Sequence, residues 1–206
     1  MKVIQFIVLG WGIFTLIAAG LWIGVVFVGP IRKMEQNNTL AKSSLNYYSR
    51  NTFVVETCTV AALMGLLGII LCVYSLIPKP TMGIVSYIGL ALAVISALAT
   101  VGYFGYTYFH MRNATNASMS SSLALWEEKF GCCGWDVYRQ KPLCASDVGS
   151  LNPNMTCKIK TQPLRNASLQ NFAVGCFFIV VLFVSAVMII ILQQKTKDTT
   201  GGYTPV

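Results

Sequence analysis

The chain has 206 residues, of which 55% are hydrophobic and only 11% are charged, and its formal net charge is +8. Soluble chains carry roughly 25% charged residues, so this composition excludes a soluble globular protein. The basic residues are scattered through polar segments without forming a cluster. That distribution argues against a nucleic-acid partner and favours attraction to anionic lipid or acidic surface groups.

Four long segments of the sequence lack charged side chains. A spanning helix needs about 20 apolar residues to cross roughly 30 Å of hydrocarbon, and each of these segments is long enough. They show none of the alternation typical of barrel strands, so helices are the expected solution in lipid. The segments lie between Lys2 and Arg32, between Glu56 and Lys79, between Lys79 and Arg112, and between Arg165 and Lys195. The sequence therefore predicts an all-α membrane protein, a four-transmembrane-helix bundle with a small disulfide-bonded extracellular subdomain.

The first apolar run continues well beyond the 7–15 residues of a signal-peptide core, so we expect it to remain as an uncleaved anchor that ends before Pro30. Gly20 and Gly24 have the spacing that lets helices approach closely in lipid. The expected organisation is the N-terminus and first helix at 1–29, a small extracellular loop at 30–52, the second helix at 53–77, a short cytosolic turn at 78–81, the third helix at 82–109, a large extracellular loop at 110–171, the fourth helix at 172–192 and a cytosolic tail at 193–206.

Glycosylation acceptors indicate which side of the membrane the loops face. Every Asn-x-Ser/Thr motif in the chain falls in the two predicted loops, and such acceptors function only outside the cell or in the lumen. The acceptors are Asn37, Asn113, Asn116, Asn154 and Asn166. The large loop also contains four cysteines, an even number that is typical of small segments stabilised by disulfides in an oxidising compartment. Both features place the loops outside.

The distribution of basic residues does not support that orientation. The tails and the turn carry Lys2, Lys79, Lys195 and Lys197, whereas the first loop alone carries Arg32, Lys33, Lys42 and Arg50. The positive-inside rule is therefore neutral or predicts the opposite orientation. We give the acceptors and cysteines more weight because long loops translocate largely regardless of charge. The expected location is the plasma membrane, with an endosomal or lysosomal membrane as the alternative.

The segment Phe130-Gly131-Cys132-Cys133-Gly134-Trp135 is the most informative part of the sequence. Adjacent cysteines are poorly placed to bond each other, so each is expected to reach a different partner. The remaining cysteines of the loop are Cys144 and Cys157, which leaves two pairings open. Either pairing draws two chain segments to one point.

Around this motif the chain resembles the tetraspanins over essentially its whole length. The resemblance rests on Cys132-Cys133-Gly134, on the later Pro142-Leu143-Cys144, on Cys157 ahead of the fourth helix, on Gly20-Leu21-Trp22 near the end of the first helix, and on a short loop followed by a long one. It implies disulfides between Cys132 and Cys157 and between Cys133 and Cys144. The chain departs from the family in lacking an asparagine in the first span, an acidic residue in the third and cysteines beside the first helix.

The resemblance also implies a helix before Cys132 that continues from the third span. The local sequence agrees, because Ser120–Ser122 can cap such a helix and Glu127–Lys129 are expected to face water. Its apolar face is expected to comprise Leu123, Leu125, Trp126 and Phe130.

The function that the resemblance implies is lateral organisation of the membrane. Other integral membrane proteins, other tetraspanins among them, and membrane lipid are the expected partners, and a bound sterol or lipid is implied by similar proteins. No metal or other cofactor is expected. The partner surface is expected between Cys133 and Cys157, where five side chains could contact a partner or fill the loop's own core: Trp135, Val137, Tyr138, Leu143 and Leu151.

Three other functions fit the sequence less well. A channel or transporter needs polar groups along a path, and the predicted spans offer few. A claudin-like junction protein has its large cysteine loop first, whereas here it comes second. No constellation of residues supports an enzyme, because His110 is the only histidine and the loop cysteines are expected in disulfides.

A few residues outside the loop carry separate hypotheses. Cys72, near the inner end of the second helix, is a palmitoylation candidate or a buried packing residue. Tyr203 and Val206 form a candidate sorting signal, with a PDZ ligand or an inert tail as alternatives. Packing roles are expected for Cys58 and Cys176, an interfacial position for His110, and a solvated or locally paired carboxylate for Glu56.

Overall fold

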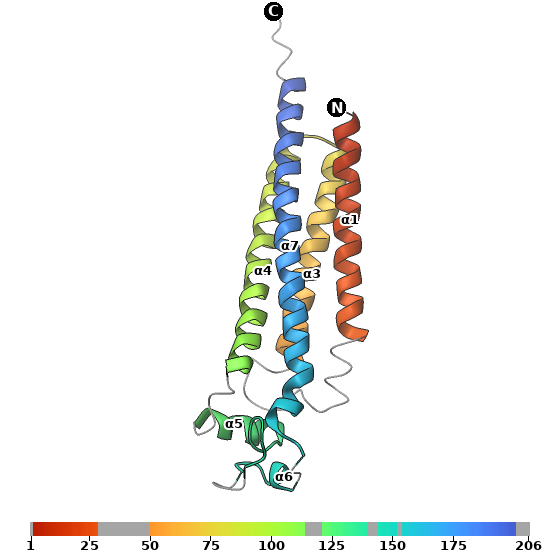
Figure 1. Ribbon diagram of the computed structural model, residues 1–206. Coiled ribbons are helices and arrows are strands. Elements are labelled where there is room, and N and C mark those ends of the chain that lie inside the picture. Colours follow the sequence, from red (N-terminus) through yellow and green to blue (C-terminus); the bar gives the residue numbers. More distant parts are fainter. Residues whose placement is uncertain (1, 29–49, 114–120, 140–143, 152–153, 201–206) are drawn as a thin grey trace, which may run out of the picture. The chain divides into compact units, whose positions relative to one another are not determined.

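The computed structural model describes residues 2–28, 50–113, 121–139, 144–151 and 154–200. Within these ranges every regular element is a helix, and four helices are long and apolar enough to cross a membrane (Figure 1). These four are α1 (Lys2–Val26), α3 (Arg50–Leu76), α4 (Pro80–Asn113) and α7 (Cys157–Thr200). The prediction of an all-helical chain with four candidate spans is confirmed.

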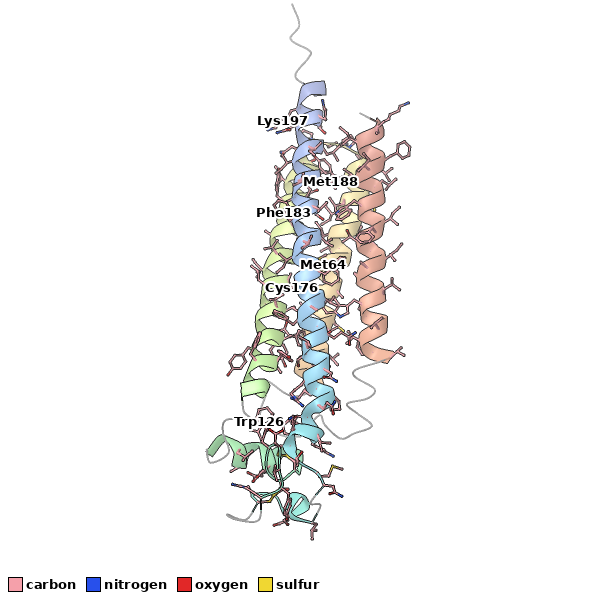
Figure 2. The ribbon with its side chains drawn as sticks, viewed as in Figure 1. Met64, Trp126, Cys176, Phe183, Met188 and Lys197 are labelled. Atoms are coloured by element: carbon pink, nitrogen blue, oxygen red, sulfur yellow. A yellow bond between two sulfur atoms is a disulfide. The ribbon has the colours of Figure 1, made fainter. Side chains whose placement is uncertain are left out.

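The outward faces of the four long helices are apolar. Phe6, Ile95 and Phe183 are 71%, 66% and 72% exposed, and Figure 2 shows Phe183 on α7. Leaving such a side chain in water costs about 1.5–3 kcal/mol relative to burying it, so this surface suits hydrocarbon. The chain is therefore a multi-pass membrane protein.

The chain divides into two compact units, which we describe separately. The span unit consists of Met1–Gly24, Thr57–Val101 and Ala173–Val206, and the loop unit consists of Val25–Glu56 and Gly102–Phe172. The loop unit thus contains the ends of the long helices as well as two short helices, α5 (Ser121–Phe130) and α6 (Asp147–Ser150).

In the span unit, α1 and α3 touch backbone to backbone. A Cβ added to Gly12 would lie 2.9 Å from the carbonyl oxygen of Gly68, and one added to Gly68 would lie 2.9 Å from that of Gly12. Small residues allow this approach, and a larger side chain at either position would force the helices apart. Among the described residues, nothing lies within 4 Å of a Cβ built at Gly20 or Gly24, so the helix contact that their spacing would allow is not made there.

Side-chain hydrogen bonds place α7 beside both α1 and α4 in the span unit. The indole N–H of Trp11 donates to Oγ of Ser185 at 2.9 Å, and the hydroxyl of Tyr87 donates to Oε1 of Gln193 at 2.8 Å. The connection between α3 and α4 is only residues 77–79, and Pro80 begins α4 at a position where its missing N–H costs nothing. A connection this short makes α3 and α4 antiparallel neighbours.

The fourth long helix extends well beyond its predicted bounds of 172–192. α7 begins at Cys157 and ends at Thr200, so part of the predicted loop and part of the predicted tail are helical. The part of α7 that precedes residue 172 buries Thr161, Leu164, Ser168 and Asn171 at helical spacing. Three of these four residues are polar, so the segment lacks the continuous apolar run by which a membrane span is predicted. Pro163 lies inside this segment and is a residue that normally argues against a helix interior.

Candidate functional site

Helix α5 supplies the apolar floor of the loop unit. Leu123, Trp126 and Phe130 are 2%, 6% and 4% exposed, at the spacing of one helical face. Their predicted burial is confirmed. The side chain of Leu125 lies outside the described residues, as do residues 114–120, on which the predicted continuity with α4 depends.

An aromatic cluster joins α5 to the cysteine motif. The rings of Trp126 and Phe130 stack with centroids 5.3 Å apart, and Trp135 meets Trp126 edge-on at 5.9 Å (Trp126 is labelled in Figure 2). Such offset and edge-to-face contacts stabilise beyond the area that they bury. Trp135 is only 3% exposed, so it fills the core of the loop unit and is not available to a partner.

Two disulfides radiate from the adjacent cysteines. Cys132 is bonded to Cys157 and Cys133 to Cys144, with Cα atoms 4.9 and 5.5 Å apart. Both separations fall in the usual range for disulfides. These are the pairs that the tetraspanin resemblance implies, and they tie both the start of α7 and residue 144 to one point.

The glycines of the motif allow the chain to turn there. Gly131 and Gly134 have φ angles of 61° and 68°, a left-handed conformation that side chains disfavour. A Cβ on Gly134 would also collide with the carbonyl oxygen of Val137, and a Cβ on Gly149 in α6 would collide with that of Cys132. The backbone of α6 therefore packs directly on the cysteine motif.

The backbone of the motif caps the start of α7. The first N–H groups of a helix have no partner within it. Here the N–H of Cys157 donates to the carbonyl of Gly134 at 2.8 Å, and the N–H of Lys158 donates to that of Trp135 at 3.0 Å. The side chain of Lys158 also pairs with Asp136. The motif thus fixes where α7 begins.

Glu127 lies at the centre of the unit, and the prediction that it faces water is wrong. Its side chain is fully buried, whereas the neighbouring Glu128 is exposed. The carboxylate accepts the N–H of Gly134 at 2.8 Å, the N–H of Ala145 at 3.0 Å and a guanidinium N–H of Arg139 at 2.6 Å. Burial alone would raise the pKa of Glu127, but these three donors outweigh it and hold the pKa below its ordinary value.

Glu127 also lies near two sulfur atoms, but the group is not a metal site. One oxygen of Glu127 and the sulfurs of Cys133 and Cys144 lie within 4.8 Å of one another. Metals bind cysteine as the thiolate, and both sulfurs are joined to each other in the disulfide. The carboxylate is already hydrogen-bonded, so its role is to connect three chain segments.

The segment between the disulfides presents two large apolar side chains. Val137 is 77% exposed and Leu151 is 79% exposed. The hydroxyl of Tyr138 donates to the carbonyl of Ser150 at 2.9 Å. This bond joins the residue that follows Val137 to the residue that precedes Leu151. Leu143 lies outside the described residues. Of the side chains expected to contact a partner, Val137 and Leu151 are therefore the exposed pair, which we call the apolar pair.

The part of the chain that follows Cys144 is held in place by a helix cap at the start of α6. Ser146 precedes α6 and is almost buried, and its hydroxyl accepts the N–H of Gly149 at 3.2 Å. This is the usual way for a serine to satisfy the first turn of a helix. Leu151 follows directly after α6, so the cap holds its position relative to the disulfides.

Two of the predicted glycosylation acceptors are accessible. Asn154 and Asn166 are both exposed, Asn166 on α7. Asn113 ends α4, and its side chain lies outside the described residues. Asn37, Asn116 and Pro142 also lie outside them, as do the sorting-signal residues Tyr203 and Val206.

The cysteines of the helices differ in exposure. The thiol of Cys72 lies 3.9 Å from the carbonyl oxygen of Leu9, in the contact between α3 and α1, which fits the packing alternative. Its acylation stays a prediction. Cys58 is half-buried, but Cys176 is exposed on α7 (Figure 2), so the packing role predicted for Cys176 is wrong. Glu56 is half-buried on α3, and the side chain of His110 lies outside the described residues.

No family model, curated protein or solved structure matches this chain.

Proposed function

We propose that this protein is a tetraspanin-like organiser of the membrane, which associates laterally with other integral membrane proteins and clusters or escorts them. The observation that carries the proposal is the apolar pair, Val137 and Leu151, held on a unit fixed by two disulfides. A preorganised apolar surface binds a partner without the cost of ordering a loop. Such a surface suits recognition of a protein, and no reactive group accompanies it among the described residues of the unit.

The proposal includes the orientation in which the loop unit lies outside the cell, at the plasma membrane. Disulfides persist in oxidising compartments, and the exposed Asn154 and Asn166 are accessible to glycosylation there. Both termini would then be cytosolic.

Three buried hydroxyls of the span unit support an organiser over a channel. Thr15, Ser86 and Ser185 are buried, and each hydroxyl donates to a carbonyl four residues earlier in its own helix, at 2.8–2.9 Å. Hydroxyls bonded in this way satisfy themselves locally. They do not line a polar path of the kind that conduction requires.

The proposal is tested by changing the apolar pair. Replacing Val137 and Leu151 together by serine removes apolar area worth about 1.5–3 kcal/mol for each side chain that a partner buries. We expect the yield of adducts with other membrane proteins to fall at least tenfold, since 1.4 kcal/mol corresponds to a factor of ten. The measurement is quantitative mass spectrometry after treating intact cells with a membrane-impermeant crosslinker.

Ile159→Ser is the matched control. Ile159 is 55% exposed but lies beyond Cys157, outside the proposed surface, so its change should leave the adducts within about twofold. Equal adduct yields from the wild type and the double variant would contradict the proposal. So would an ion flux or a cell–cell barrier that depends on the protein while no partner is crosslinked.

A further inference from the structure

A cavity between α1 and α3 in the span unit has a composition that the proposed function does not explain. Its volume is about 440 Å³, which lies within the usual size range of ligand pockets, about 300–1,000 Å³. Residues from one face of α1 form one wall, and the end of α3 forms the other. The lining residues are Lys2, Gln5, Phe6, Leu9, Ser75 and Leu76. We call this cavity the α1–α3 groove.

The groove follows from how the two helices pack. α1 and α3 are in backbone contact at Gly12 and Gly68, which are too small to separate them. One turn closer to the start of α1, the thiol of Cys72 lies in the contact between the helices, 3.9 Å from the backbone carbonyl oxygen of Leu9. Beyond that turn the groove is lined by residues near the start of α1 and the end of α3. The groove therefore opens at the edge of the apolar span.

The walls combine an apolar surface with a cationic rim. Phe6 and Leu76 are 71% and 68% exposed, so the groove is open to its surroundings, which for a spanning helix are lipid. Lys2 is exposed and forms no ion pair with any residue that the structure describes. A long lysine side chain at a helix end places its ammonium group at the depth of lipid headgroups. Gln5 adds an amide to the same rim.

The whole end of the span unit at which the groove opens is basic. The N-terminus, the α3–α4 connection and the end of α7 lie at this end (Figure 1). The sequence of the unit contains four lysines, Lys2, Lys79, Lys195 and Lys197, against a single carboxylate, that of Asp198. A surface of this sign attracts anionic lipid, and a lysine adjacent to a bound headgroup contributes roughly 1 kcal/mol.

We propose that the α1–α3 groove binds one phospholipid with a net negative headgroup. The ammonium group of Lys2 and the amide of Gln5 bind the headgroup, and the acyl chain lies against Phe6, Leu9 and Leu76. A sterol presents a hydroxyl and no negative charge, so Lys2 would give it no advantage. The inference rests on the span unit alone and is independent of the partners of the loop unit.

The test uses the full chain purified in mild detergent, with retained lipid counted by native mass spectrometry. Phosphatidylserine and phosphatidylcholine with identical acyl chains are added separately. We expect the wild type to retain phosphatidylserine preferentially, and Lys2→Gln to lower that retention about fivefold without changing retention of phosphatidylcholine. Lys79→Gln is the matched control, because it removes the same charge from the same end but does not line the groove. Its effect should be less than twofold.

A photoreactive phosphatidylserine locates the site. Crosslinks should map to peptides containing Gln5 or Ser75, and their yield should fall about fivefold in Lys2→Gln. Equal retention of the two phospholipids by the wild type would overturn the proposal, as would an equal loss in Lys2→Gln and Lys79→Gln. Displacement of phosphatidylserine by cholesterol with no effect of Lys2→Gln would assign the groove to a sterol instead. Unchanged elution volume and disulfide content show that each variant is folded.

Discussion

Replacing Glu127 by glutamine is expected to destabilise the loop unit by about 3–5 kcal/mol, because the change leaves the guanidinium of Arg139 without its buried counter-charge. The carboxylate is fully buried and accepts three hydrogen bonds, from Arg139 and from the amides of Gly134 and Ala145. A glutamine offers only one accepting oxygen, so at least one of these donors would face an N–H group. Unsatisfied buried donors add to the loss.

The loss is measured by amide hydrogen exchange of the full chain, followed at Cys133 and Cys157. The N–H groups of these residues bond to Met155 and Gly134, so their exchange reports opening of the unit. We expect exchange at least 100-fold faster in Glu127→Gln, since each 1.4 kcal/mol corresponds to a factor of ten. The matched control is Glu128→Gln, an exposed neighbour, which should change exchange by about twofold or less.

Adding Arg139→Gln to Glu127→Gln should restore part of the stability, because it removes the orphaned cation. A Glu127→Gln variant that exchanges as slowly as the wild type would show that the carboxylate does not hold the unit together.

The same carboxylate makes the unit sensitive to acid. The pKa of Glu127 is lowered on folding from an ordinary value of 4.5, so the ionised form stabilises the folded unit. This contribution is fully present above about pH 4.5 and is lost as the pH falls through the lowered pKa. The wild type should therefore lose protection in this acid range, after correction for the intrinsic exchange rate. Glu127→Gln should lose much less.

Replacing Cys132 and Cys157 together by serine is expected to abolish delivery of the protein to the cell surface. The bond closes a separation of 25 residues, and its loss costs about 3.5 kcal/mol on the loop-closure estimate. It also frees the start of α7, which Gly134 caps through the N–H of Cys157. Cell-surface biotinylation should show at least a tenfold decrease, because a small unit has little stability to spare.

The second disulfide and an unpaired cysteine provide the comparison. Cys133 and Cys144 are only 11 residues apart, so replacing both by serine should cost about 2.8 kcal/mol and reduce delivery less. Cys58→Ser changes a thiol outside both disulfides and should leave delivery within about twofold. Normal surface levels of the Cys132→Ser, Cys157→Ser variant would contradict the view that the Cys132–Cys157 disulfide organises the unit.

The four long helices could be predicted because apolar length alone determines them. The lipid environment requires each apolar segment to satisfy its own backbone, so no tertiary information is needed. The extension of α7 back to Cys157 could not be predicted in the same way. Its first turns are polar and contain Pro163, and they depend on carbonyls of Gly134 and Trp135 from elsewhere in the chain.

The role of Glu127 was equally hidden from the sequence. Within α5 the run from Glu127 to Lys129 is a polar stretch on a short amphipathic helix, which normally faces water. Its burial depends on Arg139, 12 residues away, and on the amide of Ala145, 18 residues away. Arg139 offers the one signal in the sequence. It lies between Cys133 and Cys144, and the disulfide that joins them holds its cation close to the cysteine motif.

The sequence also could not separate core from surface between the disulfides. Trp135 and Val137 are two residues apart and both apolar, yet the first is buried against Trp126 and the second is exposed. The turn at Gly134, with its left-handed backbone, decides which way each side chain points. A pattern of apolar residues contains no such information in a loop.

We expect the loop unit to lie outside the cell and to be closed there by its two disulfides. Non-reducing peptide mass spectrometry of the protein from cells, before and after N-glycosidase, tests it most directly. We expect sugar on the accessible acceptors Asn154 and Asn166, on molecules whose peptides are joined as Cys132–Cys157 and Cys133–Cys144. Unmodified acceptors together with free loop thiols would place the loop in the cytosol and contradict both the orientation and the proposed function.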